Sequence, residues 1–159
     1  MRFAAIFSAA ALTAFAGAAV AAPTVDVAIG PNLQKKANKY GAREFDYLRQ
    51  DLARTFARTR GLDGAEVKLV IAEATPNRPT FKQLGDRVGL SMQSISIGGA
   101  RIEGAVTYPD GRTVPVNYSY YDPDIVQAAW QGLTTWSTAQ HAFDMAARKA
   151  ARHGAVVTR

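Results

Sequence analysis

Three polar residues near the carboxyl-terminal end of the sequence are of the types that perform nucleophilic catalysis. Ser137, His141 and Asp144 follow at i, i+4 and i+7, so one helix face would carry the three residue types of a hydrolase triad. On a single helix they would lie about 6 Å apart at the backbone, and no nearby motif supplies an oxyanion hole. We interpret Ser137 as a helix cap and the other two as surface residues. We expect no enzymatic activity and keep a hydrolase as the second alternative.

The sequence offers few ligands for a metal ion. Asp122 and Asp124 flank a proline, but calcium takes six or more oxygen ligands and no further carboxylates follow at a suitable spacing. His141 and His153 are the two histidines, and a histidine-based zinc site would need more partners. A turn in which Asp124 caps the following segment explains the aspartates better. We therefore expect neither a metal nor a cofactor.

Basic residues in two places could bind an anion. Two prolines stiffen a loop over residues 76–80 that contains Asn77 and Arg78, and Arg101 begins a predicted hairpin. Such a loop can present a guanidinium group to a carboxylate or phosphate. In the second place, a helical wheel puts four basic residues within about 60° of one another, opposite an apolar stripe. These four are Lys36, Arg43, Arg54 and Arg58.

The composition narrows the classes of function. The 159 residues include 19 Lys and Arg, 13 Asp and Glu and no Cys, with a formal net charge of +6. Without Cys, the sequence excludes disulfides, thiolate metal sites, a cysteine nucleophile and lipid attachment through cysteine. The basic surplus indicates either an anionic envelope partner or a charge that only maintains solubility.

The first residues are typical of a secretory signal peptide. Arg2 precedes an apolar and small-residue run over residues 3–22, and an Ala-Val-Ala triplet ends at Ala21. We expect residues 1–21 to be removed and residues 22–159 to form a single periplasmic α+β domain. No later stretch reaches transmembrane length, and an exported protein is not expected to meet nucleic acid.

Hydrophobic periodicity predicts two helices and several strands. Apolar residues recur every three or four positions over residues 41–59, which indicates an amphipathic helix. A second helix is expected over residues 137–153, with a buried stripe made mostly of alanine. Alternating apolar residues predict strands over residues 24–29, 65–74 and 91–97.

The clearest local prediction is a β-hairpin around the Tyr-Pro-Asp-Gly-Arg turn at residues 108–112. Pairing Tyr108 with Arg112 sorts apolar residues onto one face of both strands and polar residues onto the other, so turn chemistry and patterning agree on one register. Pro115 then falls at a non-hydrogen-bonded position. The strand over residues 113–120 is therefore predicted to be a sheet edge.

Together these elements predict an α+β fold. A sheet with polar residues on one face leaves its other face for the helices to cover. We expect a two-layer sandwich with a mostly antiparallel sheet of about four or five strands and two helices packed on one face.

Four segments in residues 65–152 carry a resemblance. They are Pro-Asn-Arg-Pro-Thr at 76–80, Gly-Leu at 89–90, Ser-Ile-Ser-Ile-Gly-Gly-Ala at 94–100 and the closing helix at 136–147. With these segments the chain resembles an uncharacterised family of exported proteobacterial envelope proteins, many of them lipoproteins. The resemblance implies a periplasmic α+β domain similar to those of outer-membrane accessory lipoproteins, and no active site. This chain lacks the acylated cysteine of the lipoprotein members.

These observations favour a non-enzymatic periplasmic binding domain, accessory to an outer-membrane or envelope assembly and peripheral to the outer membrane. The expected partner is an unknown envelope protein or an anionic envelope component. Strand addition at the predicted edge is one mode of binding. The first alternative is a binder of anionic lipid or polysaccharide that uses the basic helix face.

Overall fold

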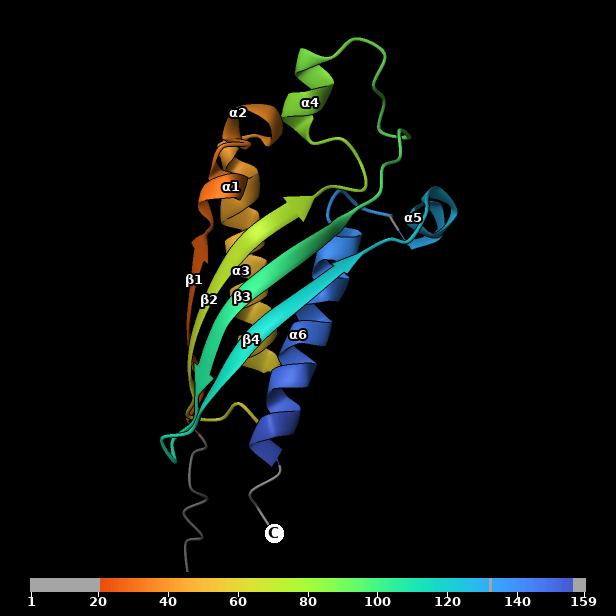
Figure 1. The fold of residues 1–159 in the computed structure, drawn as a ribbon. Coiled ribbons are helices and arrows are strands. Elements are labelled where there is room, and N and C mark those ends of the chain that lie inside the picture. Colours follow the sequence, from red (N-terminus) through yellow and green to blue (C-terminus); the bar gives the residue numbers. More distant parts are fainter. Residues whose placement is uncertain (1–20, 132, 156–159) are drawn as a thin grey trace, which may run out of the picture.

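A four-stranded sheet forms one layer of the computed structural model, which describes residues 21–131 and 133–155. The strands are β1 (Thr24–Ile29), β2 (Glu66–Thr75), β3 (Gly99–Thr107) and β4 (Thr113–Tyr121), in the order β1-β2-β3-β4 (Figure 1). β1 runs parallel to β2, and the other two pairs are antiparallel. The sheet is therefore mixed, although two of its three pairings are antiparallel as expected.

Two long helices, α3 (Ala42–Arg58) and α6 (Ser137–Ala155), cover one face of the sheet and form the second layer (Figure 1). α3 carries the chain back from β1 to the start of β2, as two parallel neighbours require. Its buried side chains are those that the periodicity predicts: Phe45, Leu48, Leu52 and Phe56. α6 buries Phe143 together with several alanines, whose small side chains let the helix lie close to β3 and β4.

Four short helices lie outside these two layers. α1 (Pro31–Gln34) and α2 (Ala37–Tyr40) follow β1, α4 (Phe81–Asp86) follows β2, and α5 (Ile125–Gln131) follows β4. These short helices are not among the two that the periodicity predicts. Figure 1 shows α4 and α5 near the end of the sheet where β2 and β4 finish.

The β3–β4 hairpin confirms the predicted register. The Tyr108 N–H donates to the Arg112 oxygen at 2.8 Å, and pairing continues without a shift as far as Gly99 opposite Tyr121. β4 stands at the edge of the sheet, as the position of Pro115 indicated.

The predicted strand over residues 91–97 is wrong, because these residues form a loop between α4 and β3. Gly99 pairs with Thr75, the last residue of β2, and Pro76 follows without an N–H to donate. Residues before Gly99 therefore have no strand beside them, and the observed sheet has four strands. The apolar alternation here puts Ile95 and Ile97 on the surface.

In the part of the chain that the structure describes, no helix combines the length and the hydropathy that crossing a bilayer requires. The expected signal peptide over residues 1–21 lies almost wholly outside the described residues.

Candidate functional site

The three residues of the triad pattern do not form a catalytic arrangement. The Ser137 hydroxyl is hydrogen-bonded to Thr134, accepting from its N–H at 2.8 Å, and among the described residues it accepts from no backbone N–H of α6, as a helix cap would. His141 is exposed, and its ring packs edge-on against Tyr120 with centroids 5.0 Å apart. No hydrogen bond links Ser137, His141 and Asp144 among the described residues. The part of the chain that the structure describes also contains no group of three or more His, Cys, Asp or Glu side chains that could hold a metal ion.

The structure separates Asn77, Arg78 and Arg101. Asn77 is fully buried, whereas the Arg78 guanidinium lies at the surface and donates to the Gln93 oxygen at 3.1 Å. Arg101 lies on the open face of the sheet and forms an ion pair with Glu103 at 2.6 Å. Each of the three therefore has a partner within the chain.

The predicted basic stripe is also divided. Gly41 adopts φ = 98° and ends α2 before α3 begins, so Lys36 does not continue the wheel of α3. Arg43 lies at the amino-terminal end of α3, and Arg54 and Arg58 lie in its last turns. The latter two face a groove between α3 and α6.

Asn77 belongs to a buried polar hub that it forms with Asp122 and Thr138. Its Nδ2 donates to Asp122 Oδ2 at 2.8 Å, and its Oδ1 accepts from the Thr138 N–H at 3.0 Å. The Thr138 hydroxyl and the Gly98 N–H donate to the same Asp122 oxygen, at 2.8 and 3.1 Å. The three hub side chains are at most 3% exposed. Asp122 Oδ1 has no partner among the described residues.

The hub holds the loop at residues 76–80 against the start of α6. The Asn77 N–H donates to the Thr135 oxygen at 2.7 Å, which ties the loop to the segment that leads into the helix. A Cβ at Gly98 would overlap the Asn77 amide, so the hub also requires glycine at that position. This arrangement fixes two separate parts of the chain relative to each other.

α4 begins directly after this fixed loop. Thr80 and Gln83 form a capping box, in which Thr80 Oγ1 accepts from the Gln83 N–H at 3.2 Å, and both side chains are buried. Phe81, which follows Thr80 and is the first residue of α4, points outward and is 81% exposed. The large aromatic side chain is therefore held at the surface by a well-anchored helix start.

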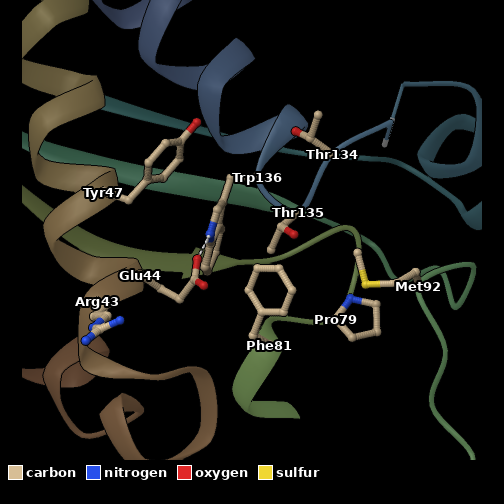
Figure 2. Close-up of a pocket in the computed structure, with 9 residues that line it drawn as sticks. All are labelled: Arg43, Glu44, Tyr47, Pro79, Phe81, Met92, Thr134, Thr135 and Trp136. Atoms are coloured by element: carbon tan, nitrogen blue, oxygen red, sulfur yellow. Dashed lines mark hydrogen bonds between the residues drawn. The ribbon is translucent and has the colours of Figure 1, made fainter. Parts of the chain in front are cut away.

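A pocket of about 290 Å³ lies between Phe81, α3 and the segment before α6 (Figure 2). Its walls are mainly aromatic and apolar, and its lining residues come from three parts of the chain. They are Arg43, Glu44, Tyr47, Pro79, Phe81, Met92, Thr134, Thr135 and Trp136. The hub ties together two of these walls, because it joins the 76–80 loop to Thr135.

Trp136 forms the back of this pocket. Its indole Nε1 donates to Glu44 Oε2 at 2.6 Å (Figure 2). Its ring also meets Tyr40 edge-on, with centroids 5.9 Å apart. Burial raises the pKa of Tyr40, which favours the neutral form of the phenol next to Trp136. The back of the pocket is therefore aromatic, and Glu44 and Arg43 provide charge at one side.

Exposed apolar side chains lie on two segments, 81–97 and 125–133, at one end of the molecule, and two of them, Phe81 and Met92, line the pocket. We call this surface the apolar end; Figure 1 shows its segments at the end opposite the carboxyl terminus of α6. It consists of Phe81, Val88, Met92, Ile95, Ile97, Ile125, Val126, Trp130 and Leu133. Trp130 is 81% exposed and Leu133 is 78% exposed. Among the described residues, the one other large exposed apolar side chain is Tyr47, which lines the pocket.

Sequence reasoning missed most of this surface. The sequence does not distinguish the roles of the two tryptophans: the structure places Trp136 in the core and Trp130 on the surface of α5. The available signal was the run of apolar residues around Trp130, in a segment too short to supply a core stripe. Such a surface suits binding of an apolar group, with polar groups at its border setting the orientation.

Comparisons of the chain with protein family models, with curated proteins and with solved structures give no match.

Proposed function

We propose that this protein is a non-enzymatic binding domain of the bacterial cell envelope that docks a partner protein through its apolar end. The pocket between α3, Phe81 and Trp136 receives an apolar side chain of the partner. Export through residues 1–21 and membership of the envelope family that the chain resembles are parts of the same proposal and rest on the sequence.

The observation that carries the proposal is the concentration of exposed apolar groups. Nine large apolar side chains are exposed on two segments, 81–97 and 125–133. Leaving such groups in water costs about 25 cal/mol for each Å² of apolar area, so a patch of this kind is retained where a partner covers it.

The composition of the pocket favours a protein as the partner. Protein interfaces are enriched in Trp, Tyr, Phe, Met and Arg at their centres, and these five residue types all line this pocket. A concave pocket with an adjacent Glu44 carboxylate also fits a single protruding side chain better than it fits a flat bilayer surface.

Strand addition at β4 is less favoured than the apolar end. In the β3–β4 pairing, positions 113, 115, 117, 119 and 121 direct their backbone groups to the free edge. Pro115 removes the donor near the middle of this row, and proline on an edge strand limits pairing with another chain.

Site-specific photo-crosslinking in the cells that produce the protein tests this proposal. A photoreactive phenylalanine analogue is placed at Phe81 or at Trp130 in the full-length chain, and at Asn117 on β4 as the matched control. We expect both apolar-end positions to give a discrete adduct with the same protein. We expect Asn117 to give none.

A second variant excludes nonspecific capture. Met92→Ser removes an apolar wall of the pocket without touching the hub, and we expect it to reduce the Phe81 adduct at least tenfold while the amount of folded protein stays constant. Adducts at Asn117 alone would contradict the proposal and favour strand addition. Adducts with lipid alone, or with many proteins at equal yield, would also contradict it.

A further inference from the structure

A second surface lies between the carboxyl-terminal halves of α3 and α6. A hollow of about 370 Å³ and a shallower, more open hollow beside it share Thr59 and Arg148 in their linings. We call this surface the arginine groove, and it is defined by its five arginines. They are Arg54, Arg58, Arg60, Arg148 and Arg152.

The positive charge of the groove is poorly compensated within the chain. Asp51 and Asp144 are the two carboxylates in its lining, against five guanidinium groups. The single ion pair there joins Arg54 to Asp51 at 3.4 Å. Arg58, Arg60, Arg148 and Arg152 form no hydrogen bond or ion pair with any residue in the described ranges, and all four are exposed.

Several cations elsewhere on the described surface are paired, although others, such as Lys36, Arg87 and Lys149, also form no ion pair and differ from the groove in not being clustered with four other arginines. Five other ion pairs, with N–O distances of 2.6 to 2.8 Å, neutralise Arg49, Lys68, Lys82, Arg101 and Arg112. These cations each have a carboxylate within four residues along the chain. In the groove, by contrast, four arginines from α3 and α6, together with Arg60 just beyond the end of α3, have two aspartates in the same lining.

The residue type indicates the ligand. Every basic residue in the groove is arginine, whose planar guanidinium donates two parallel hydrogen bonds to phosphate, whereas lysine acts as a point charge. The groove extends over two hollows and several arginines, so it fits a ligand with more than one anionic group.

From this arrangement we propose that the arginine groove binds closely spaced phosphate groups of an envelope component. The groove replaces the stripe predicted from one helical wheel: Arg54 and Arg58 remain, Lys36 and Arg43 do not take part, and the arginines of α6 complete it. This site is independent of the apolar end, because Figure 1 places the carboxyl-terminal turns of α3 and α6 at the other end of the molecule.

Binding to two phosphate probes tests the proposal. The purified protein is titrated with inorganic tripolyphosphate and with vesicles of cardiolipin in phosphatidylcholine, at low and high salt. We expect saturable binding to at least one probe that weakens as salt rises. Binding to tripolyphosphate identifies a free phosphate chain as sufficient, and binding to cardiolipin vesicles alone identifies a lipid headgroup.

Paired variants separate the groove from general charge. The double variant Arg58→Gln/Arg148→Gln removes two groove cations, and Arg49→Gln/Lys149→Gln removes two cations of the same helices outside the groove lining. We expect at least a tenfold loss of affinity in the first and less than a twofold loss in the second, with both proteins folded. Arg58→Lys, which keeps the charge, should show an intermediate loss. Equal losses in the two double variants, or no binding to either probe, would overturn the proposal.

Discussion

The ionisation of Tyr121, on β4, makes the free energy of unfolding depend on pH. Burial of its ring and the nearby Glu73 carboxylate raise the pKa of Tyr121 to about 12. Because the neutral phenol is favoured in the folded state, this group stabilises the protein fully below its unfolded pKa of 10. The contribution decreases as pH rises from about 10 to about 12.

Tyr121→Phe should therefore make the free energy of unfolding less dependent on pH in that interval. Tyr40, whose pKa is also raised, leaves part of the dependence in place. Urea unfolding at several pH values between 9 and 12 measures the effect. A variant with the same slope as the wild type would show that Tyr121 is as readily ionised in the folded state as in the unfolded chain.

Asn77 is the residue on which the geometry of the pocket depends. Asn77→Ala removes two buried side-chain hydrogen bonds and leaves the Thr138 N–H without that acceptor. We expect the free energy of unfolding to fall by about 3 kcal/mol, because buried groups left unpaired cost 1–3 kcal/mol each. Asn117→Ala, on the exposed face of β4, is the control and should change it by about 0.5 kcal/mol or less. Equal effects of the two substitutions would contradict the role of the hub.

At the scale of the elements, the sequence predicts those helices and strand pairings that are determined by residues close together along the chain. The hairpin register follows from the turn at residues 108–112 and from the side-chain alternation beside it, and the structure confirms it. The helix predicted over residues 41–59 is α3, because its apolar spacing depends on that segment alone. Both predictions use information that is local along the chain.

Other elements depend on contacts between distant segments. The alternation over residues 91–97 resembles a strand, but whether it pairs depends on where β2 ends. The direction of β1 relative to β2 likewise depends on how α3 crosses the sheet. The hub joins residues 77, 122 and 138, so its formation could not be predicted from any one stretch of sequence, although Asn77 and Asp122 were each singled out for other roles.

The contact between β2 and β3 gives a prediction at this scale. Gly104 adopts φ = 149°, and a Cβ there would lie 2.9 Å from the Leu69 Cα and closer still to the Lys68 oxygen. We expect Gly104→Ala to lower the free energy of unfolding by about 2 kcal/mol or more, because the clash is with backbone rather than with a flexible side chain.

Gly85→Ala is the matched control for this substitution. Nothing lies within 4 Å of a Cβ at Gly85, which is exposed in α4. Alanine there should raise stability by about 0.5–1 kcal/mol through helix propensity. Chemical denaturation measures both variants. If Gly104→Ala were neutral, the close approach of β2 and β3 would be incorrect.

At the scale of the whole molecule, the two proposed surfaces lie at opposite ends (Figure 1). The apolar end surrounds α4 and α5, and the arginine groove lies between the last turns of α3 and α6. Under the two proposals, a partner at one end would leave the other accessible, and the protein would connect an envelope protein to a phosphate-bearing component. Accordingly, the double variant Arg58→Gln/Arg148→Gln should give the same yield of the photo-crosslinked adduct at Phe81 as the wild type.

Calorimetric titration of the purified protein with the partner captured at Phe81 tests the central claim most directly. Burial of the apolar end predicts a negative heat capacity change of binding. Phe81→Ser should weaken binding at least tenfold, equivalent to about 1.4 kcal/mol, and Asn117→Ser should bind like the wild type. If Phe81→Ser bound the partner with unchanged affinity and heat capacity, the apolar end would not be the binding surface.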